Sequence, residues 1–265
     1  MKPSTATSTK GRKYTWTPSR VHASDPIKLF TVTHMQKAIP IVDLRPVCAP
    51  VFDQGQIGSC TANALAAAYE FDMAKQHEKH VFRPSRLFIY WNERVIEGTT
   101  DQDAGAQIKD GVTTLAKTGI CPEYHWPYDE SQFAVQPPQA AFDEAKKHVA
   151  TGYHVVVQTL PQLKQALLNG FPIVFGFTVY DSFENGNWDS TTGMMPMPAS
   201  TEQVLGGHAV LIVGYDDTKQ AFIVRNSWGP DWSILKGYFY MPYQFVCDSN
   251  QCSDFWTVTS TSDSA

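Results

Sequence analysis

The chain has 265 residues, of which 43% are hydrophobic, 12% aromatic and 18% charged. This composition excludes a disordered chain and fits one large globular domain or two lobes that share a cleft. The formal net charge of −5 argues against a nucleic-acid binder, and the lack of an apolar run of about 18 residues argues against a membrane-spanning protein.

Residues 1–39 are mostly polar, and we interpret them as a leader rather than a domain. They lack the apolar segment of a secretory signal, so we expect a cytoplasmic protein or one secreted by a non-classical route. Five basic residues precede the first acidic one. Such a stretch is typical of a solvated tail, or alternatively of an arm that touches an acidic partner.

The first half of the remaining chain has helical periodicity. Apolar residues between positions 60 and 76 recur at three- and four-residue steps, which predicts a helix with one buried stripe. The residues of this stripe are Ala62, Leu65, Ala66, Tyr69 and Met73. Capping and stop signals predict further helices at 85–97, 106–118 and 139–149.

The second half of the chain is predicted to consist mainly of strands. Short β-branched and aromatic runs, bounded by Gly, Asp or Pro, lie at 153–157, 172–180, 209–215, 221–225, 237–241 and 255–258. A single helix is predicted among them at 161–169, with a glycine after it. Helices first and strands later indicate an α+β fold of two lobes rather than a βαβ repeat.

Two residues in this pattern are suited to nucleophilic catalysis. Cys60 lies where a glycine-containing loop meets the first helix, and a helix N-terminus favours the thiolate form of a cysteine. His208 follows two glycines and opens the strand 209–215, which suits a general base at the rim of a cleft. Taken alone, each of these residues also fits a buried structural position.

Asn226 follows the predicted strand 221–225. A hairpin turn links this strand to 209–215, so the two strands should be antiparallel neighbours. Asn226 would then lie close to His208 and could fix the orientation of its imidazole. Trp228 would shield that hydrogen bond from water, or serve as an ordinary core aromatic.

Gln54 is a fourth candidate, because its amide and the Cys60 backbone N–H could form an oxyanion hole. A solvated turn residue is the alternative for Gln54. Together, the candidates form an ordered set of motifs: Gln54-Gly55-x-x-Gly58-Ser59-Cys60, Gly207-His208-Ala209-Val210 and Asn226-Ser227-Trp228-Gly229.

With these motifs, residues 40 to about 258 resemble the papain-like cysteine peptidases of family C1. His208 follows Cys60 by 148 residues and Asn226 follows it by 166, against roughly 130–150 in the family. Ile57 stands where animal and plant members have a disulfide-forming cysteine. The chain is therefore most similar to a cysteine-poor, microbial-type branch.

The resemblance implies a papain-like α+β fold with a helical N-terminal lobe, an antiparallel β-barrel-like C-terminal lobe and an active site in the cleft between them. It divides the chain into the leader 1–39 and a peptidase domain 40–265. Within this domain we expect the helical lobe at about 50–150 and the β-rich lobe at about 151–265.

The resemblance further implies a cysteine endopeptidase that acts through a thioester acyl-enzyme. Cys60 would be the nucleophile, paired as a thiolate with the imidazolium of His208, and His208 would protonate the leaving amine. Asn226 would orient His208, and Gln54 would be an oxyanion donor. An extended substrate would be bound by residues lining the cleft: Gly105, Ala106, Gly207 and Trp228.

Two other functions remain open. The same triad would support transglutaminase-like acyl transfer to an amine, and a catalytically retired binding protein could keep the fold. The presence of all four catalytic side chains argues against the second. We expect a monomer that binds polypeptide substrates and protein inhibitors, and no nucleic acid, membrane, metal or other cofactor.

The remaining cysteines do not define a framework. Cys48 with Cys121, and Cys247 with Cys252, could form disulfides or stay free thiols. Since the leader is too short for a long inhibitory prosegment, we expect either a structural arm packed on the body or a short plug across the cleft. Its buried anchors should be Trp16, Leu29 and Phe30.

Overall fold

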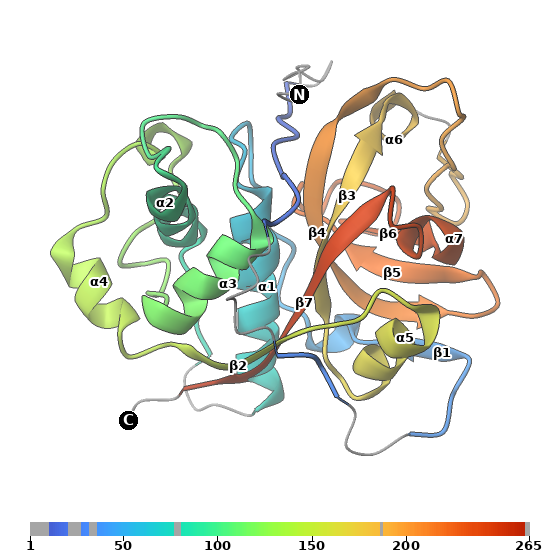
Figure 1. Ribbon diagram of the computed structural model, residues 1–265, viewed down its shortest axis with the longest axis horizontal. Coiled ribbons are helices and arrows are strands. Elements are labelled where there is room, and N and C mark those ends of the chain that lie inside the picture. Colours follow the sequence, from blue (N-terminus) through green and yellow to red (C-terminus); the bar gives the residue numbers. More distant parts are fainter. Residues whose placement is uncertain (1–10, 21–27, 32–35, 77–80, 186–187, 263–265) are drawn as a thin grey trace.

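The computed structural model describes residues 11–20, 28–31, 36–76, 81–185 and 188–262. Within them, the helical half and the strand-rich half form two sides of one molecule (Figure 1). The expected two-lobe α+β architecture is thus confirmed. No helix in the described part of the chain is long and apolar enough to cross a membrane.

The helical side is built as the stop signals indicate. The Ser85 hydroxyl caps α2 by accepting the Phe88 backbone N–H at 3.2 Å, and Gly98 ends that helix. The helix predicted at 139–149 is shorter than expected. The bounds are α1 (Cys60–Lys75), α2 (Arg86–Glu97), α3 (Ile108–Lys117) and α4 (Gln139–Ala145), with 3-10 turns η1 (Arg45–Val47) and η2 (Glu130–Gln132).

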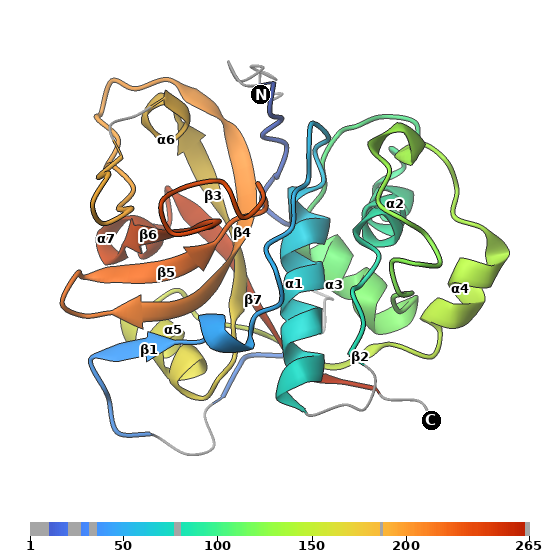
Figure 2. The same cartoon turned by 180° about the vertical axis from the view of Figure 1, so that it is seen from behind.

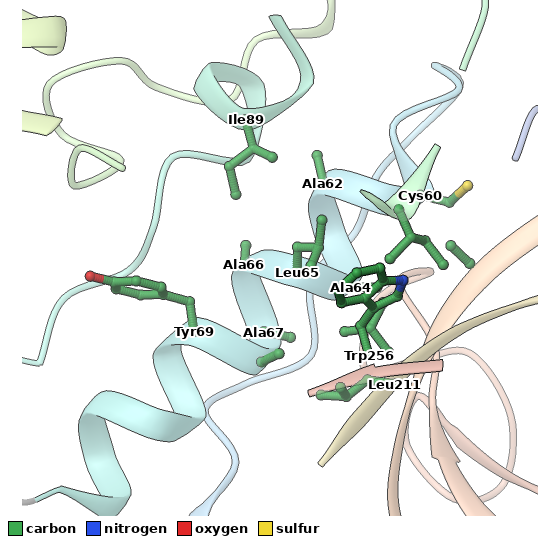
Figure 3. Close-up of a cluster of buried hydrophobic side chains, with 14 of the residues drawn as sticks. Cys60, Ala62, Ala64, Leu65, Ala66, Ala67, Tyr69, Ile89, Leu211 and Trp256 are labelled. Atoms are coloured by element: carbon green, nitrogen blue, oxygen red, sulfur yellow. The ribbon is translucent and has the colours of Figure 1, made fainter. Parts of the chain in front are cut away.

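α1 differs from the predicted helix with one buried stripe, because every residue from Cys60 to Met73 is buried. Figure 3 shows the reason: Ile89 of α2 lies on one side of α1, while Leu211 and Trp256 of the sheet lie on the other. The helix runs between the two lobes, as the reverse view also shows (Figure 2). A helix in that position has no solvent face, so the expectation of a single stripe was wrong.

The β-rich side is one antiparallel sheet of order β2-β7-β3-β4-β5-β6, and β1 pairs with β4 outside this order. Three short elements, β1, α6 and α7, were not predicted. The bounds are β1 (Ile41–Asp43), β2 (Ala150–Val155), α5 (Leu160–Leu168), β3 (Ile173–Tyr180), α6 (Asp181–Asn185), β4 (Val204–Asp216), β5 (Ala221–Arg225), β6 (Tyr238–Pro242), α7 (Tyr243–Val246) and β7 (Cys252–Thr261).

β4 begins earlier than the sequence indicates, so His208 lies inside a strand rather than opening one. The pairing of Phe177 with His208 and of Thr178 with Gly207 continues the ladder through the glycine pair that reads as a loop in the sequence. The predicted hairpin of β4 and β5 is present and antiparallel, and it ends one residue before Asn226. All five cysteines are free thiols.

Candidate active site

Cys60 is the first residue of α1, as predicted, and its side chain is fully buried. Burial raises the pKa of its thiol to about 12, since a thiolate loses its hydration there. The backbone N–H of Ala209, which lies beside the sulfur, acts in the opposite direction and lowers the pKa. This N–H belongs to the residue after His208, so the two candidate residues lie next to each other across the lobes.

His208 is hydrogen bonded to Asn226, with 2.8 Å between Nε2 and Oδ1. Oδ1 also accepts the Ser227 backbone N–H at 2.9 Å, which identifies it as the acceptor. His208 therefore carries its proton on Nε2, and its buried Nδ1 has no hydrogen-bond partner within the described residues. The Trp228 ring stacks on the imidazole at 5.1 Å and shields this hydrogen bond.

Burial also controls the charge of His208. It lowers the pKa of the imidazole to about 4, although the Asn226 hydrogen bond favours the protonated ring. The positive charge of Arg12, a leader residue, lowers that pKa further. Burial thus disfavours both charged forms, the thiolate of Cys60 and the imidazolium of His208, whereas the resemblance implies a thiolate–imidazolium pair.

Gln54 is 2% exposed, which rules out a solvated turn residue. Its Oε1 accepts the Ser227 hydroxyl at 2.6 Å, and its Nε2 donates to the Ile57 carbonyl at 3.1 Å. An amide nitrogen carries two hydrogens, so one remains for another acceptor. Sequence reasoning assigned no role to Ser227, although it lies within the Asn226 motif.

The leader passes through this site. Figure 1 shows residues 11–20 between the two lobes, above the N-terminal end of α1. The Trp16 backbone N–H donates to the Gly207 carbonyl at 3.0 Å, and the Gly207 N–H donates to the Tyr14 carbonyl at 3.4 Å. The Thr15 hydroxyl reaches the opposite lobe and donates to the Gly58 carbonyl at 3.0 Å.

Three of the four predicted substrate-binding residues therefore contact a peptide already: Gly105, Gly207 and Trp228. A Cβ on Gly105 would lie 2.2 Å from the Thr15 carbonyl oxygen, so the leader needs a glycine there. Ala106 is the next residue and is buried. Gly207 pairs with the leader backbone, and Arg12 lies 4.0 Å above the Trp228 ring.

Trp16 is the main side-chain anchor of this segment. It is 6% exposed, and a Cβ on Gly176 would lie 1.9 Å from its ring. Tyr14 packs edge-on against the His208 ring at 6.0 Å between centroids. A signal for this segment was present in the sequence, because Tyr14-x-Trp16 alternates like a strand.

A second leader segment packs away from the site. Phe30 is buried against Phe171, and its backbone N–H donates to the Val155 carbonyl at 2.8 Å. Leu29 is 53% exposed, so the expectation that it is an anchor was wrong. Adjacent residues of an extended chain point in opposite directions, and only one of this pair can face the protein.

Comparisons with known proteins agree with this architecture. The family model described as papain family cysteine protease matches residues 40–256. An uncharacterized peptidase C1-like protein of Acanthamoeba polyphaga mimivirus is 48% identical over 236 residues, which are 84% of this chain and 75% of that protein. A cathepsin B-like protein of Giardia intestinalis, CP2, is 29% identical over 78% of this chain and 68% of its own length.

Among solved structures, the chain is similar to xylellain, a cysteine protease from Xylella fastidiosa. The two share 38% sequence identity and superpose with a TM-score of 0.86, covering 98% of this chain and 99% of the other. The similarity covers nearly the whole chain, and the expected papain-like fold is confirmed.

Proposed function

The chain belongs to the papain family of cysteine proteases, and from this premise we propose that it is an endopeptidase with Cys60, His208 and Asn226 as its catalytic triad. One observation carries the assignment. His208 donates from Nε2 to Asn226 under the Trp228 ring, and its Nδ1 is left without a partner beside the strand position that contacts the Cys60 sulfur. An imidazole held in this way is prepared to accept a proton from a thiol.

In the proposed reaction, Nδ1 of His208 takes the thiol proton and the thiolate attacks the peptide carbonyl. The free amide hydrogen of Gln54 and the Cys60 backbone N–H stabilise the resulting oxyanion. The imidazolium then protonates the leaving amine, the C–N bond breaks, and a thioester remains on Cys60. Water, deprotonated by His208, attacks the thioester and releases the acid.

We also propose that the form described here is latent, with leader residues 12–16 as a plug and residues 28–31 as a structural arm. The plug satisfies the backbone groups that a substrate would use, because Gly207 already donates to and accepts from it. The plug also changes the electrostatic environment of the catalytic pair. Arg12 disfavours the imidazolium of His208, and burial disfavours the thiolate of Cys60.

Labelling with an epoxysuccinyl thiol-protease inhibitor, followed by peptide mapping, tests the triad. We expect one adduct on Cys60 and none in the Cys60→Ala or His208→Ala protein. The Cys48→Ala protein is a matched control that should label normally. Hydrolysis of peptides should be abolished by Cys60→Ala, nearly abolished by His208→Ala and reduced less by Asn226→Ala.

Two results would contradict the proposal. Measurable hydrolysis that is equal in the wild-type and Cys60→Ala proteins would exclude the nucleophile. An adduct on a different cysteine would place the reactive thiol elsewhere.

A further inference from the structure

The leader is a peptide bound in the cleft, so its side chains mark where the cleft contacts the side chains of a bound chain. Two consecutive basic residues, Arg12 and Lys13, precede the segment that pairs with Gly207. Each contacts a carboxylate, and the two carboxylates belong to opposite lobes. Neither of these two carboxylates was among the candidate site residues from the sequence.

Lys13 pairs with Asp103 in the loop between α2 and α3, with 2.6 Å between Nζ and Oδ2. The other carboxylate oxygen of Asp103, Oδ1, is hydrogen bonded to groups of the body. Oδ1 accepts the Gly58 backbone N–H at 2.8 Å and the Tyr90 hydroxyl at 2.5 Å. The side chain is only 7% exposed. Asp103 is therefore held in one orientation by groups of the body, and Oδ2 is the oxygen that contacts the leader.

Arg94 holds the loop that carries Asp103. This side chain is fully buried and donates to the carbonyls of Thr100 and Gln102 at 3.0 Å each. The Tyr90 hydroxyl also accepts the Gly105 backbone N–H at 3.2 Å. The carboxylate is thus fixed by the same contacts that fix the backbone at Gly105, and these contacts come from the body of the protein rather than from the leader.

On the other lobe, Arg12 lies between Glu184 of α6 and the face of Trp228. The guanidinium is 3.9 Å from Oε1 of Glu184, whose side chain is fully buried, and 4.0 Å from the centre of the Trp228 ring. An aromatic face and a carboxylate together favour a planar cation. The Tyr14 hydroxyl also donates to Glu184.

We propose that Asp103 and Glu184 are specificity-determining residues, and that the preferred substrates are polypeptides with basic side chains in the cleft. The inference rests on the proposed endopeptidase function. When the leader leaves, Lys13 and Arg12 leave with it, and a substrate lysine or arginine restores the lost pairs. An acidic side chain in the same place meets a like charge.

Position-scanned, internally quenched peptides test this inference. Each position in turn is Lys, Arg, norleucine or Glu, and kcat/KM is measured with full-length protein that carries Trp16→Ala to loosen the plug. The ratio of kcat/KM for two peptides in one preparation does not depend on the fraction of open or active enzyme. The variants are Asp103→Asn and Glu184→Gln. Asp101→Asn, an exposed residue of the same loop, is the matched control.

We expect Lys to exceed norleucine by roughly five- to tenfold at one position, because Lys13 is half exposed and Asp103 is not. Asp103→Asn should reduce this ratio to about one, and Asp101→Asn should leave it unchanged. Glu184→Gln should reduce to about one the ratio of kcat/KM for Arg over norleucine at a different peptide position. In the Trp16→Ala protein with no other substitution, the ratio of kcat/KM for Lys over norleucine should also fall as the salt concentration rises from about 0.05 to 0.5 M.

Ratios near one at every position, or a preference that survives Asp103→Asn and high salt, would overturn the inference. The carboxylates would then serve the leader alone. Hydrolysis of none of the peptides by a Trp16→Ala protein whose Cys60 is labelled by the epoxysuccinyl inhibitor is a different result. It would refute the proposed endopeptidase function, and with it the proposed substrate specificity.

Discussion

Replacing Trp16 with alanine should convert the latent protein into an active one. Burial of an aromatic side chain of about 200 Å² is worth about 5 kcal/mol as a transfer free energy. The remaining Cβ and the ordering of the leader reduce this to about 3 kcal/mol of docking free energy. That is roughly a 150-fold change in the equilibrium between docked and undocked leader.

The assay is the second-order rate constant for epoxysuccinyl labelling of Cys60 in the full chain. We expect it to rise by up to about 100-fold in the Trp16→Ala protein, and to level off where the open form predominates. Phe30→Ala is the control, because that side chain anchors the leader outside the cleft. It should lower the melting temperature and change the labelling rate less than twofold.

An unchanged labelling rate in a folded Trp16→Ala protein would refute the reasoning. Residues 12–16 would then be a structural arm like residues 28–31. Equal acceleration by Trp16→Ala and Phe30→Ala would instead mean that the leader undocks as one unit, and the separate roles proposed for its two segments would be wrong.

Other predictions concern the same site. Gly176→Ala places a Cβ 1.9 Å from the Trp16 ring, so it should speed labelling in the wild-type background and add nothing in Trp16→Ala. Ser227→Ala leaves the buried Oε1 of Gln54 without its hydroxyl, and kcat should fall about tenfold with little change in KM. Burial and the charge of Arg12 lower the pKa of His208 to about 4 with the leader docked, and we expect this pKa to rise when undocking removes Arg12 and admits water. The undocked form thus binds more protons, and wild-type labelling relative to Trp16→Ala should rise as pH falls from about 6.5 to 4. Arg94→Met removes a buried cation that donates to four carbonyls, and should lower the free energy of unfolding by about 2–4 kcal/mol in denaturant titrations.

Much of the framework could be predicted because local signals decided it. β5 has the predicted bounds, and α2 ends at the glycine that follows Glu97. Elements decided by distant partners were missed. β1 has only three residues and exists through its pairing with β4. The glycine pair before His208 reads as a loop, yet its ladder with β3 makes it part of a strand.

For the candidate site, too, residues with local sequence signals could be predicted and residues defined by distant partners could not. Cys60, His208, Asn226 and Gln54 could be proposed because their motifs have characteristic neighbours in sequence. Asp103 could not, since nothing local distinguishes it from other loop acids. Its neighbours Gly58, Tyr90 and Lys13 come from three distant parts of the chain. A single sequence contains no signal that joins them.

The leader and the cleft that it fills belong to one polypeptide, which has a consequence for how the latent state responds to concentration. A tethered segment is present at its own binding site at an effective concentration on the order of millimolar, whatever the concentration of the protein. Diluting the protein therefore leaves the occupied fraction of the cleft unchanged, whereas an inhibitor supplied by a second molecule would be lost. The same leader added as a free peptide to an enzyme cut after residue 20 would have to reach that millimolar level to restore latency.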